Sequence, residues 1–270
     1  MLLVDTAATE ARTLALREAV RSLSAAPVRT VVNTHHHGDH THGNHIFADT
    51  ARIIGHERCP EEVVAQGELL RRVWPTVDWG RTDQYPPTDT YADRLGLTVG
   101  DIRVELVHVP PAHSTNDTVV WLPDHGVLFL GDVVFSRCTP FILMGSLSGS
   151  LAAIGRLRAF GAETLVSGHG PVADAAVFDV AERYLTWLTA LAAESHAAGR
   201  SALEAARAAR AGEFEGWDEF AGLGESERLP ANLRRAYAEL DGAEPGAPLD
   251  IAAAIADMAA FHGGLPASYA

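Results

Sequence analysis

The chain has 270 residues, of which 47% are hydrophobic, so it can bury a large core in one domain and still carry an appended subdomain. Its formal net charge of −14 argues against nonspecific binding to nucleic acid or to an anionic membrane surface, and no apolar run approaches the roughly 20 residues of a membrane span. The first residues lack the features of a signal peptide, and Cys59 and Cys138 form no metal or redox motif, which favours a reduced cytoplasmic protein.

Short strands and helices are predicted to alternate in the first part of the chain. From hydrophobic periodicity we expect strands at residues 2–4, 28–33 and 51–56, and helices at residues 8–23 and 57–73. An Asp or Thr is available to cap the first helix. Residues 74–92 are rich in Pro, Asp, Thr and aromatic residues without periodicity, which is typical either of a binding loop or of a plain surface excursion.

A histidine-rich loop follows the predicted strand at residues 28–33. Six of the 13 histidines fall between residues 35 and 45. His35 and His37 are two apart in an extended segment, so their side chains point the same way. Gly38 permits a tight turn before Asp39 and His40. Because neutral imidazole suits zinc, the pattern His-x-His-x-Asp-His predicts two ligands for one metal and two for a neighbouring one. The other three histidines, His36, His42 and His45, are expected at the surface or behind the ligands.

Three further polar motifs end predicted strands in the middle of the chain. We expect strands at 102–109, 119–121, 127–130 and 163–167, with helices at 150–160 and from Pro171 to about residue 196. The motifs after these strands are Pro110-Pro111-Ala112-His113, Gly131-Asp132 and Gly168-His169-Gly170. Residues 200–270 are Ala-rich and predicted to be mostly helical, with breaks near 222–230 and 242–248.

Taken in this order, the four motifs resemble those of the metallo-β-lactamase superfamily. Ala112 stands where the family usually has Gly in its Pro-Gly-His turn. The resemblance implies an α/β fold, an αββα sandwich whose motifs meet at one edge of two sheets. It also implies further strands before residue 2, so we expect the N-terminal part of the fold to be shortened. The predicted organisation is a catalytic domain over residues 1–198 and a mostly helical C-terminal extension over 199–270, packed on it.

A binuclear zinc site, rather than one with iron or manganese, is implied by the same resemblance. The implied ligands are His35, His37 and His113 for one metal, Asp39, His40 and His169 for the other, and Asp132 as the bridge. Two cations about 3.5–4 Å apart lower the pKa of a bridging water and supply a hydroxide nucleophile near neutral pH. Asp39 is expected to act in catalysis by orienting that nucleophile. The di-iron redox branch usually carries Glu where His40 stands, together with a flavodoxin-like domain, and both are missing from this sequence.

Residues 135–151 follow the expected bridging aspartate and should line the metal cleft. The segment is apolar and interrupted by Gly and Ser, which favours a flat hydrophobic ligand, although a buried connector has the same composition. Together with residues 121–123 and 261–266, it resembles metallo-β-lactamase-fold cyclases of aromatic polyketide pathways, of the actinorhodin second-ring type. That resemblance implies a cyclase or thioesterase acting on an aromatic polyketide thioester. The expected substrate contacts are Phe135, Arg137, Pro140, Phe141 and Met144.

Two other functions stay open at this point. One is a generic hydrolase of small thioesters, lactones or β-lactams, and the other is a metal-binding protein without turnover, which the complete ligand set disfavours. The expected partner is a hydrophobic small molecule or a carrier-protein-bound thioester, with no nucleic acid and no membrane, and a homodimer is compatible with the sequence. Because carrier proteins are acidic like this chain, docking would require a local arginine patch, for example Arg71, Arg72, Arg81 and Arg137.

Overall fold

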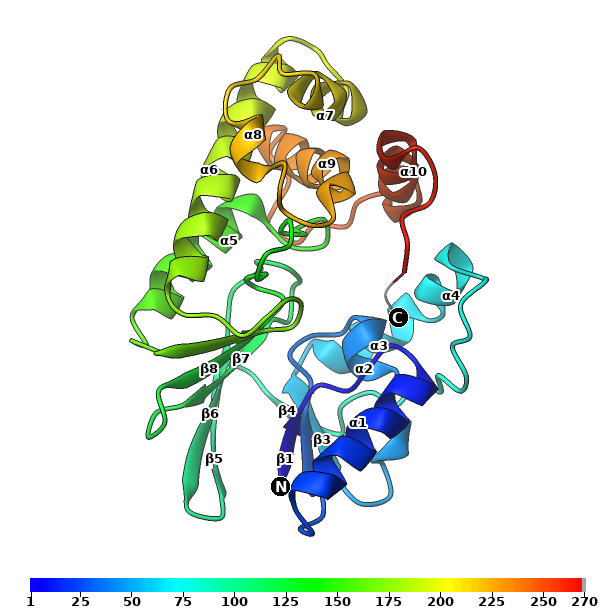
Figure 1. The fold of residues 1–270 in the computed structure, drawn as a ribbon, viewed down its shortest axis with the longest axis vertical. Helices are drawn as coiled ribbons and strands as arrows, with labels where there is room; N and C mark the ends of the chain where they lie inside the picture. The colour runs from blue at the N-terminus through cyan, green and yellow to red at the C-terminus, as the bar shows by residue number, and fades with distance from the viewer. Residues whose placement is uncertain (269–270) are drawn as a thin grey trace. The chain divides into compact units, whose positions relative to one another are not determined.

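The structure, a computed structural model, describes residues 1–268 (Figure 1). It contains two β-sheets and a set of helices, which confirms the predicted mixed α/β class. The chain divides into two compact units. Residues 1–108, 118–125 and 268 belong to the first unit, and residues 109–117 and 126–267 belong to the second.

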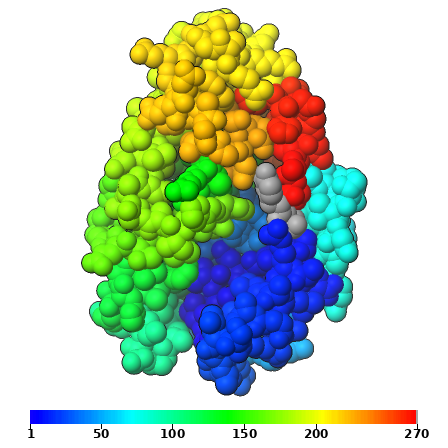
Figure 2. Space-filling view, viewed as in Figure 1, coloured from blue at the N-terminus to red at the C-terminus, as the bar shows by residue number. Residues whose placement is uncertain are grey.

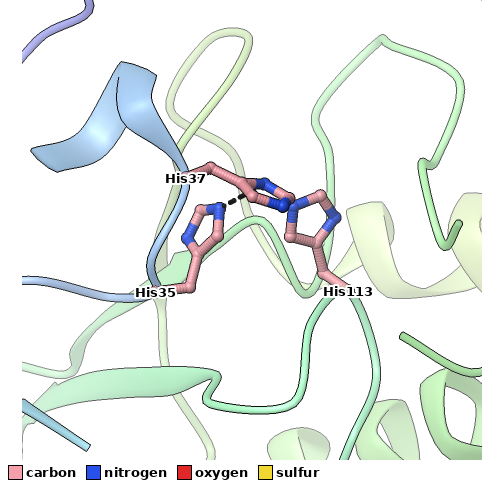
Figure 3. A group of neighbouring side chains, drawn as sticks. All are labelled: His35, His37 and His113. Carbon is pink, nitrogen blue, oxygen red and sulfur yellow. Dashed lines mark hydrogen bonds between the residues drawn. The ribbon is translucent and has the colours of Figure 1, made fainter. Parts of the chain in front are cut away.

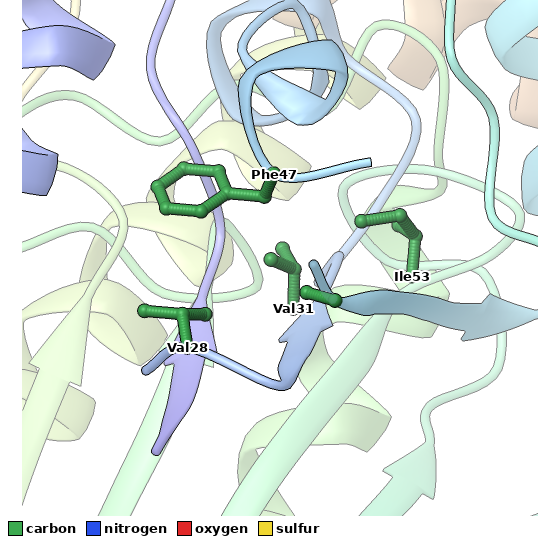
Figure 4. Close-up of a cluster of buried hydrophobic side chains, with 5 residues drawn as sticks. Val28, Val31, Phe47 and Ile53 are labelled. Carbon is green, nitrogen blue, oxygen red and sulfur yellow. The ribbon is translucent and has the colours of Figure 1, made fainter. Parts of the chain in front are cut away.

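A parallel sheet of four strands forms the first part of unit 1. In spatial order the strands are β1 (Leu2–Val4), β2 (Thr30–Val32), β3 (Arg52–His56) and β4 (Asp89–Tyr91). Every residue of β2 is buried, as expected for a parallel strand covered on both faces. Val28, Val31, Phe47 and Ile53 pack together in the core on one side of the sheet (Figure 4). This packing fixes the strand that leads into the histidine-rich loop.

Unit 1 also contains the helices α1 (Glu10–Leu23), α2 (Gly38–Thr41), η1 (Asn44–Ile46), α3 (Cys59–Gln66) and α4 (Leu69–Val73). The cap of α1 is Thr9, which the prediction placed inside the helix, and its side chain accepts a hydrogen bond from the Arg12 N–H. The prediction of one helix over residues 57–73 is wrong. Gly67 takes a φ of 55°, in a region that favours glycine, and this residue separates α3 from α4.

The remaining strands of unit 1 are antiparallel: β5 (Arg94–Val99), β6 (Ile102–His108) and β7 (Thr118–Leu122). The predictions for β6 and β7 are confirmed, but β5 and the short strand β4 had not been expected. Val99 pairs with Ile102, so a two-residue Gly100-Asp101 turn joins β5 to β6. Such a dipeptide between alternating apolar residues is a sequence signal for a hairpin.

In unit 2, the strands β8 (Val127–Gly131) and β9 (Thr164–Ser167) pair in parallel. The helix α5 (Leu147–Arg158) starts earlier than predicted because the Ser146 side chain caps it. The helix α6 (Ala176–Ala197) starts later, and Pro171 does not open it. Instead, Leu165 and Ala173 exchange backbone hydrogen bonds of 2.8 and 2.9 Å, which keeps the segment after Pro171 extended.

The C-terminal helices of unit 2 are α7 (Ala202–Arg210), α8 (Trp217–Phe220), η2 (Ser226–Arg228), α9 (Leu229–Leu240) and α10 (Ile251–His262). In unit 2, α9 packs against α5, α6, α7 and α10, and the yellow and orange side chains of α7 to α9 adjoin in the space-filling view (Figure 2). These helices lie in the same unit as residues 126–197. A domain boundary at residue 198 therefore stays a prediction. Across residues 1–268, no helix is both long enough and apolar enough to cross a membrane.

Candidate metal centre

The histidine-rich loop of unit 1 brings the four side chains of the predicted motif together. His35 Nε2 lies 3.0 Å from His37 Nδ1, and the two imidazoles point toward one another (Figure 3). The ring centroids of His35 and His40 are 4.3 Å apart. His40 Nε2 lies 3.4 Å from the Asp39 carboxylate. The loop follows β2, so these donors collect at the carboxyl end of the parallel sheet, where such sheets commonly bind ligands.

Asp5, at the end of β1, holds this loop in place. Its carboxylate accepts hydrogen bonds from the Thr34 N–H and the Thr34 hydroxyl, both 2.7 Å long. It also lies 2.9 Å from His40 Nδ1, while the Thr34 hydroxyl oxygen lies 3.1 Å from His35 Nδ1. When Nδ1 of His35 and of His40 carries the proton and donates to these oxygens, the other ring nitrogen, Nε2, is free of a proton and can bind a metal. Histidine ligands in metal sites usually have an acceptor in this position, which fixes the tautomer.

The role of Asp5 was missed from the sequence, where Asp or Thr was considered only as a helix cap. The sequence does contain a signal that predicts this contact. Asp5 immediately follows a strand, and Val4 of β1 pairs with Val32 of β2 in the parallel sheet. Residues after neighbouring parallel strands meet at one edge of the sheet, so a carboxylate at this position should face the loop after β2.

Unit 2 supplies the other three predicted ligands. Asp132 directly follows β8, and its buried carboxylate Oδ2 lies 3.5 Å from His113 Nε2 and 3.3 Å from His169 Nε2. His169 comes two residues after β9. His113, drawn in Figure 3, sits in the turn after residue 109. The carboxylate of Asp132 therefore lies near both histidines, His113 and His169.

The turn that carries His113 is closed by the buried carboxylate of Asp117. That carboxylate accepts hydrogen bonds from the N–H groups of Ala112, His113 and Ser114, at 3.2, 2.9 and 3.0 Å, and from the Ser114 hydroxyl at 2.6 Å. Burial raises the pKa of Asp117, while His113 and these hydrogen bonds oppose the rise. Ala112 takes no positive φ, so the turn accepts an alanine where the resemblance implies glycine.

Two of the five predicted substrate residues lie beside the ligands of unit 2. The Phe135 ring stacks on His169, with centroids 5.5 Å apart, and meets His113 edge-on at 5.6 Å. Phe141 lies 6.2 Å from His113, and its backbone oxygen lies 2.5 Å from His113 Nδ1. The other three differ in exposure: Arg137 is exposed, Pro140 is buried and Met144 is half-buried.

Arg228, which was not among the predicted site residues, also approaches Phe135 and Phe141. Its guanidinium carbon lies 4.7 Å from the centre of the Phe135 ring and 5.7 Å from that of Phe141, which is the geometry of a cation–π contact. The same guanidinium forms an ion pair with Glu225 and donates to the Thr139 carbonyl at 2.8 Å. No local pattern marks Arg228, because it follows Phe141 by 87 positions in the sequence.

The histidines expected outside the ligand set are mostly buried rather than at the surface. His36 Nδ1 lies 3.3 Å from Glu62, and His42 Nδ1 lies 3.2 Å from the Ala8 carbonyl oxygen. Burial lowers the pKa of His42. These contacts connect the histidine-rich loop to α3 and to the segment before α1, and they stabilise the loop that carries His35, His37 and His40.

The donor spacing in both units fits a divalent metal. Atoms bound to tetrahedral zinc at 2.0–2.1 Å lie about 3.3–3.4 Å from one another. The corresponding pairs here are 3.0 and 3.4 Å apart in unit 1, and 3.5 and 3.3 Å apart in unit 2. Each unit therefore contributes His and Asp side chains that could serve as metal ligands. Imidazole nitrogen and carboxylate oxygen together form a donor set typical of zinc.

Comparisons of the sequence with known proteins identify a family whose members share this arrangement of motifs. Residues 2–169 match the profile of the metallo-beta-lactamase superfamily. The chain is 26% identical to a linear primary-alkylsulfatase of a Pseudomonas species, over 63% of this chain and 39% of that protein. It is 30% identical to a hydroxyacylglutathione hydrolase of Rhodospirillum rubrum, over 52% of this chain and 47% of that protein. The chain thus spans less than half the length of these curated relatives.

A solved structure supports the fold. The metallo-beta-lactamase from Pontibacter korlensis superposes with a TM-score of 0.55 at 22% identity, covering 68% of this chain and 81% of that chain. At this identity the likeness concerns the fold alone, and it agrees with the two sheets and helices described above.

Proposed function

Because the chain belongs to the metallo-beta-lactamase superfamily, a family of hydrolases, we propose that it is a hydrolase with a binuclear zinc site. The proposed ligands are His35, His37 and His113 for one metal, Asp39, His40 and His169 for the other, and Asp132 as the bridge. The observation that carries this assignment is the position of Asp132. Its carboxylate lies within 3.5 Å of His113 and of His169, one histidine from each proposed set.

In this proposal, two bound divalent cations supply Lewis acidity and make a bound water acidic near neutral pH. The chain's own residues position the reactants. The Asp39 carboxylate, whose side chain is 32% exposed, can accept a hydrogen bond from the attacking water and so orient it. Asp5 and Thr34 keep the imidazoles of His40 and His35 in one orientation, which lowers the reorganisation needed during the reaction.

For the substrate, we propose a thioester with a hydrophobic acyl group, in its narrowest form an aromatic polyketide thioester. The apolar rings of Phe135 and Phe141 beside His113 support a hydrophobic group at this place. The similarity to a hydroxyacylglutathione hydrolase is consistent with thioester cleavage. The substrate would be a free small molecule or an acyl chain on a carrier protein, rather than nucleic acid or a membrane.

Sulfate-ester cleavage is a second candidate, favoured by a specific observation. An anionic substrate would require a positive charge nearby, and the guanidinium of Arg228, which also pairs with Glu225, lies against the same aromatic pair. The chain also resembles a linear primary-alkylsulfatase over 63% of its length.

A panel of four substrates distinguishes these proposals. The zinc-loaded protein would be assayed with an aryl or β-ketoacyl thioester, a lactone, a β-lactam and a primary alkyl sulfate. We expect kcat/KM to be highest for the aromatic thioester. A higher value for the alkyl sulfate would replace the thioester proposal with the sulfatase, and a higher value for the β-lactam would remove the polyketide proposal.

A further inference from the structure

One face of α9, extended by the residue before it, binds the backbone of residues 139–148, which comprise the end of the loop before α5 and the first two residues of that helix. Four polar residues form this loop-binding face: Arg228, Asn232, Arg235 and Glu239. Their spacing of four, three and four residues places them in one row along a helix. All four lie outside the matched family region, which ends at residue 169. The C-terminal helices therefore contact the segment that leads from the proposed bridging aspartate into α5.

The contacts run along the loop in order. Arg228 donates to the Thr139 carbonyl at 2.8 Å, and Asn232 donates to the Pro140 carbonyl at 2.7 Å. Arg235, which is fully buried, donates to the Leu143 carbonyl at 3.0 and 2.7 Å. Glu239 accepts from the N–H groups at Leu147, at 2.7 Å, and Ser148, at 3.2 Å. An irregular loop needs such partners because its buried backbone groups have no ladder to join.

Asn232 is connected to the proposed metal ligand His113 through one peptide group. Its side chain is fully buried, and its Oδ1 accepts a hydrogen bond of 3.0 Å from the Ile142 N–H. That N–H belongs to the same peptide group as the Phe141 carbonyl. The Phe141 oxygen in turn lies 2.5 Å from His113 Nδ1. A single planar peptide group thus stands between Asn232 and His113.

The geometry of the peptide bond makes this arrangement directional. The described chain has no cis peptide bond, so the C=O and N–H of this group point in opposite directions. When Asn232 holds the N–H, the carbonyl is held toward His113. With Nδ1 donating to that carbonyl, His113 must present Nε2, the atom that lies 3.5 Å from Asp132.

We propose that Asn232 is a positioning residue for the metal site, acting on His113 through the peptide group of Phe141 and Ile142. This inference rests on the proposed function, because it takes His113 as a metal ligand. Removing a partner that orients a ligand typically lowers metal affinity about 10–100-fold. Asn232→Ala should therefore weaken zinc binding at one of the two sites by about that factor and leave the other site close to wild type.

The test measures zinc affinity by competition with a chromophoric chelator, together with the visible spectrum of the cobalt-substituted protein. The matched control is Tyr184→Phe, since the Tyr184 hydroxyl lies 3.1 Å from Asn232 Nδ2 but takes no part in the contact to Ile142. We expect the control to keep wild-type zinc affinity and cobalt spectrum even if its melting temperature falls. An Asn232→Ala variant with unchanged affinity and spectrum would overturn the proposal.

A second variant covers the case in which Asn232→Ala does not fold. Asn232→Asp keeps an oxygen to accept from the Ile142 N–H and loses the donor to the Pro140 carbonyl. We expect near wild-type zinc affinity, and a loss as large as tenfold would refute the acceptor role. If the wild-type protein binds no zinc, the proposed function and this inference both fail. If it binds zinc and all variants bind it equally, only the inference fails.

Discussion

Replacement of Asp5 by alanine should weaken both the fold and the metal site. The carboxylate accepts from the Thr34 N–H at 2.7 Å and lies 2.9 Å from His40 Nδ1, and Thr34 and His40 are both buried. Asp5→Ala leaves these two donors without their acceptor; the Thr34 hydroxyl, which also donates to Asp5, can rotate to another partner and is not counted. A buried donor that loses its partner costs about 1–3 kcal/mol, so we expect the free energy of unfolding to fall by roughly 2–6 kcal/mol.

The assay for this prediction is urea unfolding of the metal-free protein, with zinc affinity measured separately. Zinc affinity should fall about 10–100-fold because the imidazoles of His40 and, through Thr34, His35 lose their fixed orientation. The matched control is Asp124→Ala, which breaks an exposed ion pair with Arg103 and should leave the free energy of unfolding close to that of the wild type, because solvent screens such a pair. An Asp5→Ala variant as stable as this control, with unchanged zinc affinity, would refute the reasoning.

Three further predictions concern the bridge, the pH dependence and the substrate. Asp132→Ala should lose most activity and part of its metal, measured by turnover and elemental analysis, and full turnover would exclude a bridging role. Burial and the stacked His108 lower the pKa of His56 to about 4, so the unfolded state binds more protons between about pH 4 and 6.5. Stability of the metal-free protein should therefore rise with pH across that window, and His56→Phe should flatten the dependence of melting temperature on pH. Phe135→Leu should raise KM for an aromatic thioester several-fold more than for a short aliphatic one, and equal changes would count against an aromatic site.

The histidine-rich loop was predictable because its information is local. A strand, an alternating His-x-His and a following Gly-Asp-His lie within a dozen residues, and the structure gathers all four donors. The same holds for Asp132 and His169, each of which follows a strand that periodicity indicates. Where local rules compete, the prediction fails. Pro171 is a good first helical residue, but pairing of Ala173 with Leu165 delays α6.

The residues that support the ligands were not predictable in the same way. Thr34 follows Asp5 by 29 positions, and Asn232 follows Ile142 by 90. Sequence periodicity gives no information about contacts between residues so far apart. The contact with His113 is made by the backbone carbonyl of Phe141, and a backbone group leaves no trace in the residue type. Asp5 was the exception in principle, because the edge of a parallel sheet could have been expected to bring it to the loop.

The measurement that tests the central claim most directly is the metal content of protein purified without a histidine tag, determined by elemental analysis on a sample that is also assayed for thioester hydrolysis. The proposed ligand set predicts about two zinc ions per chain, with activity lost on chelation and restored by zinc. A chain that contains no metal after incubation with zinc, or that hydrolyses the thioester equally well when metal-free, would contradict the account.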